Sequence, residues 1–192
     1  MSNRGVGPLI LNAWLSARSI ARRLPSPVPE YGGFRVDTKS DAEVARWVFP
    51  RIGSGLEELA RSISEPRYFL KLCGATTEPP ARRLADGYRI KTKRVGMVME
   101  AKIFAETGAL AASGYAAETR DVFIYDRIVT EPEHRRKGLG HALMLTLHAA
   151  RQHPSSPELL VATEDGRALY STLGWETISP YSTASIIDSL AI

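Results

Sequence analysis

The sequence predicts an α/β (α+β) domain, a mixed and mostly antiparallel sheet flanked by helices, with a helical and strand-forming extension at the N-terminus. Three strand-like runs at residues 96–105, 110–117 and 122–129 are separated by short turn-forming segments, which indicates an antiparallel meander. A basic turn with two glycines follows the third run, and a segment with leucines at helical spacing comes next. A chain of 192 residues can bury one substantial core.

The N-terminal segment predicts a helix. Leu11, Trp14, Leu15, Arg18 and Arg22 lie along it, and prolines at positions 25, 27 and 29 end it. The segment is rich in arginine and has no acidic residue before position 30. Three interpretations stay open: a helix packed on the domain or on a second subunit, a basic surface-active helix, or a transit peptide. We expect no secretory signal, because the apolar stretch is short and interrupted.

Short strands and helices are predicted on both sides of the meander. Residues 34–36 and 68–72 predict strands, and residues 56–63 predict an amphipathic helix. Ser40-Asp41-Ala42-Glu43 has the capping-box form of a helix start. Near the C-terminus, residues 175–178 and 181–187 predict a closing hairpin around Ser179-Pro180.

The most informative segment is Arg135-Arg136-Lys137-Gly138-Leu139-Gly140, between the strand at 122–129 and a helix predicted over 138–152. Such a turn leaves backbone N–H groups free at a helix start, where the helix dipole favours an anion. Three consecutive cations add attraction for a polyanion. Spacing excludes the Walker loop, which needs Lys-Ser/Thr, and the dinucleotide fingerprint, because Leu143 stands where the third glycine is required.

A second constellation lies downstream of this loop. Residues 159–163 predict a short buried strand, and Gly166-Arg167-Ala168-Leu169-Tyr170-Ser171-Thr172-Leu173-Gly174-Trp175 predicts a short helix ended by glycine. The loop pattern Arg-x-x-Gly-x-Gly resembles the pyrophosphate-binding signature of the GNAT superfamily of acetyl-CoA-dependent N-acetyltransferases. The downstream segment is similar to that superfamily's Ala-x-x-Leu-Tyr-x-x-x-Gly-Phe helix. The two signatures follow the family order over residues 121–176.

The resemblance implies a GNAT fold and transfer of an acetyl group from acetyl-CoA to a primary amine, by direct attack on the thioester and with no metal. It divides the chain into a basic N-terminal helix with a Pro-rich linker (1–32), an acceptor-side part (33–94) and a GNAT core (95–192). The basic loop is then expected to hold the pyrophosphate through its backbone amides and arginines.

Individual roles follow from the same resemblance. The backbone at Ile128, Val129 and Thr130 is expected to bind the pantetheine arm and the thioester carbonyl, with the amide of Val129 or Ile128 as the oxyanion donor. Tyr170 matches the general acid that protonates the leaving thiolate, and Thr163 stands where the family often has a pantetheine-binding asparagine. The full expected cofactor-binding set is Ile128, Val129, Thr130, Arg135, Arg136, Lys137, Gly138, Leu139, Gly140, His141 and Thr163.

The expected proton acceptor comes from strand alternation. Asp126 and Ile128 share one face of their strand, so Asp126 points toward the acceptor amine if Ile128 lines the cofactor cleft. Asp126 is therefore the candidate catalytic base, or a group that binds a cationic substrate. The alternative is an ion pair with Arg127 or Arg120. The other candidate carboxylates are Glu100 and Glu164.

Several function classes remain. The first is acetylation of a small amine or amino acid derivative, the second is acetylation of a protein N-terminus or lysine, and the third is a non-catalytic acyl-CoA sensor. A nucleic-acid module is disfavoured, because no aromatic residues interleave with the N-terminal arginines. The expected partners are therefore acetyl-CoA and an amine.

Composition adds further expectations. The net charge of +4 suits an anionic cofactor and is too small to indicate nucleic acid. The single cysteine, Cys73, permits no internal disulfide and fits a reducing compartment, so we expect a cytoplasmic protein. No apolar run reaches membrane-spanning length, and no His, Cys and carboxylate spacing indicates a metal site. A homodimer through the N-terminal helix or the C-terminal hairpin is left open.

Overall fold

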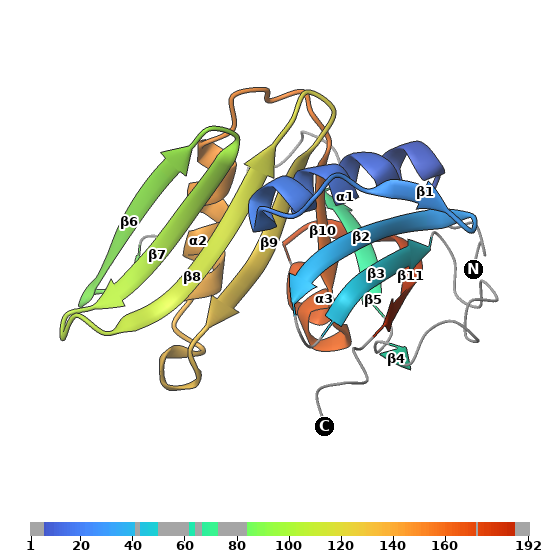
Figure 1. Cartoon of the computed structure of the whole chain (residues 1–192). Coiled ribbons are helices and arrows are strands. Elements are labelled where there is room, and N and C mark those ends of the chain that lie inside the picture. The colour runs from blue at the N-terminus through green and yellow to red at the C-terminus, as the bar shows by residue number, and fades with distance from the viewer. Residues whose placement is uncertain are drawn as a thin grey trace.

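A single twisted sheet organises the chain. The computed structural model describes residues 6–40, 43–49, 62–63, 67–72, 84–171 and 173–186. The sheet has the strand order β1-β2-β3-β11-β5-β10-β9-β8-β7-β6, and β4 pairs with β11 outside this path (Figure 1). All strand pairs are antiparallel except β10 with β9, which is parallel. The fold is therefore mixed and mostly antiparallel, as the sequence predicts.

The strands have the following bounds: β1 Val28–Glu30, β2 Gly33–Ser40, β3 Glu43–Phe49, β4 Ser62–Ile63, β5 Arg67–Leu72, β6 Tyr88–Val95, β7 Val98–Ala105, β8 Leu110–Glu118, β9 Phe123–Thr130, β10 Glu158–Ala162 and β11 Trp175–Ile186. The helices are α1 Pro8–Arg22, the 3₁₀ turn η1 Pro132–His134, α2 Leu139–Ala149 and α3 Glu164–Ser171. Strands from all three predicted segments share the one sheet, and the three-part division itself stays a prediction.

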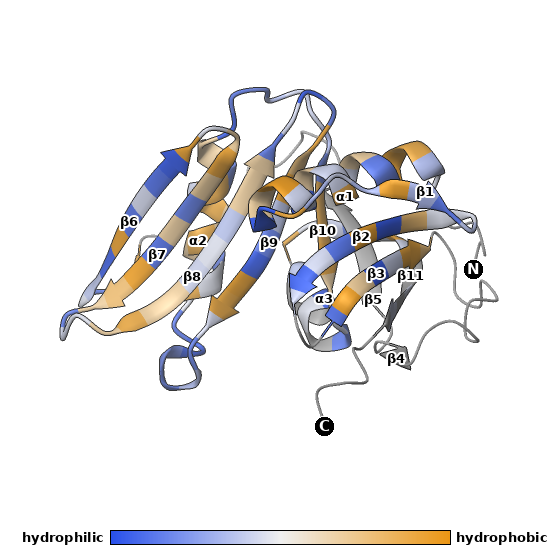
Figure 2. Ribbon diagram, in the orientation of Figure 1, coloured by the Kyte–Doolittle hydropathy of each residue, from blue (hydrophilic) through white to orange (hydrophobic). Residues whose placement is uncertain are grey.

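Two helices cover opposite faces of the sheet. In Figure 1, α1 crosses in front of β8, β9 and β10, whereas α2 lies behind β7, β8 and β9. Leu11, Trp14 and Leu15 of α1 are buried against Ile124 and Leu159. Figure 2 shows both hydrophobic and hydrophilic residues along α1, as expected for a helix with one face on a sheet. The structure thus supports the interpretation of this helix as packed on the domain.

The second core lies under α2. Leu139, Leu143 and Leu147 are at most 1% exposed and pack on the inward face of the meander. Strand β7 alternates strictly between buried and half-buried positions, which is the period expected for a strand with one face in the core. The meander predicted over 96–129 is confirmed, as is the strand predicted at 68–72.

Two local predictions are wrong, and a third is wrong at its C-terminal end. Ser40 pairs with Glu43 across the end of β2 and β3, so the capping-box pattern belongs to a hairpin and not to a helix start. Residues 175–178 and 181–187 do not form a hairpin, because 175–186 is one strand with a register shift between Thr177 and Ser179. Ser62 and Ile63 form β4 and not the end of a helix, while residues 56–61 of that predicted helix lie outside the described residues.

Candidate functional site

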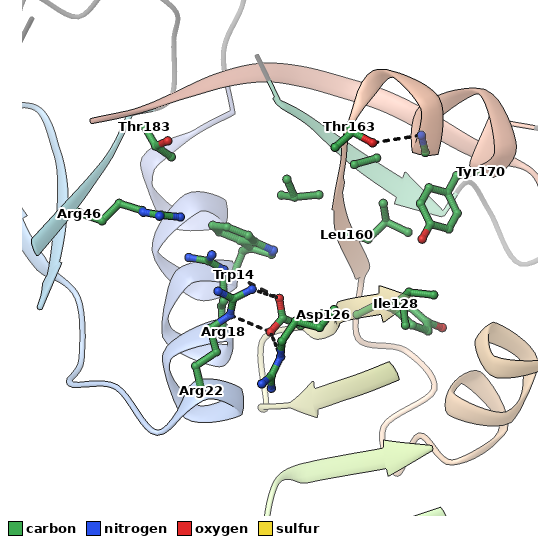
Figure 3. A pocket seen from close by; sticks show the side chains of 15 residues that line it. Trp14, Arg18, Arg22, Arg46, Asp126, Ile128, Leu160, Thr163, Tyr170 and Thr183 are labelled. Carbon is green, nitrogen blue, oxygen red and sulfur yellow. Dashed lines mark hydrogen bonds and ion pairs between the residues drawn. The ribbon is translucent and has the colours of Figure 1, made fainter. Parts of the chain in front are cut away.

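The parallel strands β9 and β10 separate before either strand ends. Their pairing runs from Phe123 with Glu158 to Tyr125 with Leu160, although β9 continues to Thr130 and β10 to Ala162. A cavity of about 450 Å³ opens in this gap. Residues of α1, β3, β9, β10, α3 and β11 line it, so segments from both ends of the chain meet there (Figure 3).

The separation leaves backbone groups of β9 facing the gap. Glu131 donates its N–H to the Ala111 carbonyl on β8 at 3.0 Å, and Val129 is the register partner of Ser113. Because hydrogen-bonding directions alternate along an antiparallel pair, the Val129 amide points to β8, and those of Ile128 and Thr130 point away from it. Of the two expected oxyanion donors, this geometry favours the Ile128 amide.

The loop between β9 and α2 has the shape of an anion cradle. Arg136 and Gly138 both have left-handed backbone, with φ of 63° and 76°. Gly138 is the residue before α2, and no side chain caps the first turn of that helix. Successive backbone N–H groups in such a turn, together with a helix start, form a concave anion site. The residues present therefore fit a phosphate group.

The basic side chains of this loop are exposed, and hydrogen bonds hold two of them. Lys137 donates from Nζ to the Tyr88 hydroxyl at 3.0 Å, and Tyr88 also contacts His134 Nδ1 at 2.9 Å. Arg135 donates from Nε to the Thr130 carbonyl at 3.3 Å. Tyr88 and His134 thus support the loop, a role that its sequence pattern did not reveal.

Two members of the expected cofactor-binding set lie apart from the rest. The Leu139 side chain is 1% exposed in the core under α2, so only its backbone can take part in ligand binding. His141 lies on α2 at a separate small cavity beside Tyr125 and Trp175. Of the expected cofactor-binding set, all of which the structure describes, only Ile128 and Thr163 line the large cavity.

Tyr170 and Thr163 do line the large cavity. Tyr170 packs edge-on to Trp175, with 6.2 Å between ring centroids, and burial raises the pKa of its phenol to about 12. The phenol is therefore protonated at neutral pH and able to donate a proton. Thr163 Oγ1 accepts the Gly166 N–H at 3.3 Å, so this hydroxyl also caps the start of α3.

Asp126 is 9% exposed and surrounded by arginines. Its carboxylate accepts two hydrogen bonds from Arg22, at 2.8 and 2.7 Å, and one from Arg127 Nε at 3.0 Å, while Arg18 Nε lies 4.0 Å away. Burial acts to raise the pKa of Asp126, but the hydrogen bonds and charges of Arg22, Arg18 and Arg127 lower it below its usual value. A lowered pKa makes this carboxylate a weaker proton acceptor.

The other candidate carboxylates lie elsewhere. Glu100 accepts from the Tyr115 hydroxyl at 2.6 Å and pairs with Lys102, and these hydrogen bonds hold its pKa below the usual value. Glu164 is exposed and paired with Arg167. Among the described residues that line the large cavity, Asp126 is the only carboxylate.

The sequence pattern did not indicate the cavity residues that come from α1, β3 and β11, which are Trp14, Arg18, Arg22, Arg46 and Thr183. These three elements lie far in the sequence from the basic loop at 135–140. The N-terminal helix did offer a signal for a basic site, because it carries several arginines and no acidic residue. Arg18 and Arg22 are four positions apart and therefore share one face of this helix.

One family model and several solved structures are similar to this chain. The family model described as an acetyltransferase (GNAT) domain matches residues 95–177. A GCN5-related N-acetyltransferase from Kribbella flavida is 15% identical with a TM-score of 0.66, covering 94% of this chain and 95% of that chain. A GNAT-family protein from Novosphingobium aromaticivorans is also 15% identical, with a TM-score of 0.61 and coverage of 94% and 98%.

A third solved structure matches a smaller part of this chain. A tandem GNAT protein from the clavulanic acid biosynthesis pathway is 17% identical with a TM-score of 0.54, covering 71% of this chain and 60% of that chain. No curated protein matches the sequence. Within the described parts of the chain, no helix is long and apolar enough to cross a membrane, and no cluster of three metal-ligating side chains occurs.

Proposed function

We propose that this chain, which matches the GNAT acetyltransferase domain over residues 95–177, transfers an acetyl group from acetyl-CoA to a primary amine of a small molecule or amino acid derivative. The observation that supports this proposal is the cavity where β9 and β10 separate, with Tyr170 at its wall and the uncapped start of α2 beyond the end of β9. We also propose the cytoplasm as the compartment, because a single cysteine fits a reducing environment.

The donor would lie along the open side of β9. The cradle from Arg136 to the first turn of α2 would hold the pyrophosphate, because its N–H groups and dipole favour anions. The Ile128 amide would face the thioester carbonyl and stabilise the negative charge that its oxygen gains during attack. Thr163 is available at the opposite wall for the pantetheine arm.

The chemistry requires two proton movements. The amine nitrogen forms a bond to the carbonyl carbon, the carbon–sulfur bond breaks, and Tyr170 gives its proton to the departing thiolate. The nitrogen loses one proton. Because the lowered pKa of Asp126 disfavours its protonation, we propose that this proton passes to water.

The shape of the acceptor side favours a small substrate over a protein chain. Trp14 and Arg18 of α1 and Arg46 of β3 line that side of the cavity with large side chains (Figure 3). A protein or peptide acceptor needs an open groove for several residues. A non-catalytic sensor is the remaining alternative, and the position of the Tyr170 phenol in the cavity wall, where a proton donor is expected, argues for catalysis.

Titration calorimetry with acetyl-CoA tests the proposal. We expect micromolar-scale binding that Gly138→Glu abolishes, because the new side chain fills the cradle and repels phosphate. Gly96→Glu is the matched control, since Gly96 also has left-handed backbone with φ of 57° and lies in the β6–β7 turn at the other end of the meander. Unchanged binding in Gly138→Glu, or an equal loss in both variants, would contradict the assignment of the cradle.

A further inference from the structure

The part of the large cavity nearest α1 is basic. Arg18 and Arg22 reach it from α1, Arg46 from β3 and Arg127 from β9. Asp126 is the only carboxylate among the described residues in the cavity lining. Figure 3 shows the guanidinium groups of Arg18, Arg22 and Arg46 on the α1 side, with Ile128 and Tyr170 on the other.

Asp126 balances only part of this positive charge. It binds Arg22 through both carboxylate oxygens and Arg127 through one, while Arg18 lies at 4.0 Å. Arg46 is held by Glu43, with hydrogen bonds of 2.7 and 2.8 Å. Among the residues that the structure describes, the carboxylates of Asp126 and Glu43 face these four arginines. A surplus of cations in a partly enclosed cavity concentrates positive potential and attracts an anion.

Thr183 supplies an independent indication of a ligand. This β11 residue lines the same cavity and is 5% exposed, yet its hydroxyl has no hydrogen-bond partner within the described part of the chain. Buried hydroxyl groups are nearly always paired, since leaving one unpaired costs about 1–3 kcal/mol. A bound group with an acceptor oxygen would satisfy it.

The basic region is distinct from the phosphate cradle. No residue of 131–141, all of which the structure describes, lines this cavity. Along the chain, Ile128 of β9 lies between Arg127 of the basic region and the cradle that follows the strand, and the thioester is proposed to lie at Ile128 and Tyr170. An anion near Arg18 and Arg46 would therefore belong to the acceptor and not to the donor.

We propose that the acceptor is an amine that carries an anionic group, a carboxylate or a phosphate, bound by Arg18, Arg46 and Thr183. This inference rests on the proposed acetyltransferase function. Arg22, Arg127 and Asp126 form a fixed scaffold at one side of this subsite. An anion bound there leaves the amine end of the same molecule directed toward the Ile128 and Tyr170 side of the cavity.

Matched pairs of amines test the proposal, with free thiol release as the readout. O-phosphoethanolamine is compared with ethanolamine, and glutamate and aspartate are compared with their α-amides and with glutamine and asparagine. We expect at least one anionic amine to have a kcat/KM about tenfold or more above its neutral partner, because hydrogen bonds to charged groups are strong. The phosphate and carboxylate arms show which anion the subsite takes.

Variants test whether the basic subsite causes the difference between anionic and neutral amines. Arg46→Gln is expected to raise KM for the anionic amine about 10- to 100-fold, and Thr183→Val about three- to tenfold, with little change for the neutral partner. Thr183→Val also removes an unpaired buried hydroxyl, so its Tm is expected to be equal or higher. Arg89→Gln, an exposed arginine on β6 that lines none of these cavities, is the matched control.

The outcomes separate this inference from the function on which it rests. Turnover of neutral amines as fast as anionic ones, or equal KM changes for both in Arg46→Gln, overturns the anionic subsite and leaves the acetyltransferase intact. Absence of thiol release with every amine argues against the acetyltransferase. In that case, calorimetry with the anionic amines decides the subsite: binding weakened by Arg46→Gln supports it, and no binding overturns it.

Discussion

Asp126→Asn tests whether this carboxylate is a base or an anchor for arginines. The substitution keeps the side-chain shape, removes the charge and places an amide NH₂ group opposite a guanidinium. In the native protein the carboxylate accepts three hydrogen bonds, two from Arg22 and one from Arg127. The variant leaves these arginines and Arg18 close together without an anion.

The expected loss of stability follows from burial. Breaking a buried ion pair costs about 3–5 kcal/mol. Asp126 is 9% exposed but Arg22 is 30% exposed, so water solvates part of the unpaired guanidinium and we expect about 2–3 kcal/mol. For a domain of this size, that loss lowers Tm by roughly 4–12 °C.

A double-mutant cycle with Arg22→Gln measures the pairing directly. We expect the double variant to lose at least about 1 kcal/mol less than the sum of the losses in the single variants, since the two side chains interact.

The stability that Asp126 contributes depends on pH with a defined sign. Because folding lowers the pKa of Asp126 below its ordinary 3.8, its stabilisation is present above that pH and is lost as the pH falls through the folded-state pKa.

The kinetic result separates the two roles. A general base typically contributes about 10²- to 10⁴-fold to a rate, whereas an anchor contributes mainly through substrate affinity. We expect kcat for a neutral amine to fall less than about tenfold in Asp126→Asn, below the range of a lost base. A loss of a thousandfold or more in a variant as stable as the native protein would refute the anchor role.

Three further predictions concern the donor side and the scaffold. Tyr170→Phe should lower kcat about 100-fold with little change in acetyl-CoA affinity. The rate of the native protein should not decline up to pH 10, since the Tyr170 phenol has a pKa of about 12. Equal turnover of the two proteins in a pH–rate series would remove Tyr170 from the mechanism. Gly114→Ala should raise KM for acetyl-CoA about threefold or more, because an added Cβ would lie 2.5 Å from Cδ1 of Ile128, a cavity-lining residue, and displace that side chain. An unchanged KM in steady-state assays would contradict this. Glu118→Gln should lower the free energy of unfolding by about 1–3 kcal/mol in denaturant titration and leave kcat unchanged. The reason is that the Glu118 carboxylate accepts hydrogen bonds from the backbone N–H groups of Gln152 and His153 at 2.7–3.0 Å. Native-like stability would show that these hydrogen bonds contribute little.

The wrong predictions at Ser40-Glu43 and Ser179-Pro180 have a common physical origin. Ser40 and Glu43 fit a helix cap, and Ser179-Pro180 fits a turn, because each pattern is compatible with more than one local structure. Strand β11 lies between β3 and β5 and pairs with both, so its partners keep it extended past Pro180. Isolated local patterns could not reveal those partners.

The sequence alone determined the features that are local in the chain. A strand, a basic turn with glycine and a helix occupy consecutive positions, and the left-handed backbone at Gly138 is what glycine permits most readily. The tertiary structure decided what faces the cavity. Arg22 meets Asp126 across 104 positions, and Arg46 and Thr183 join them from two further strands. Such contacts depend on how the sheet is assembled, so the acceptor side of the site became visible only in the folded chain.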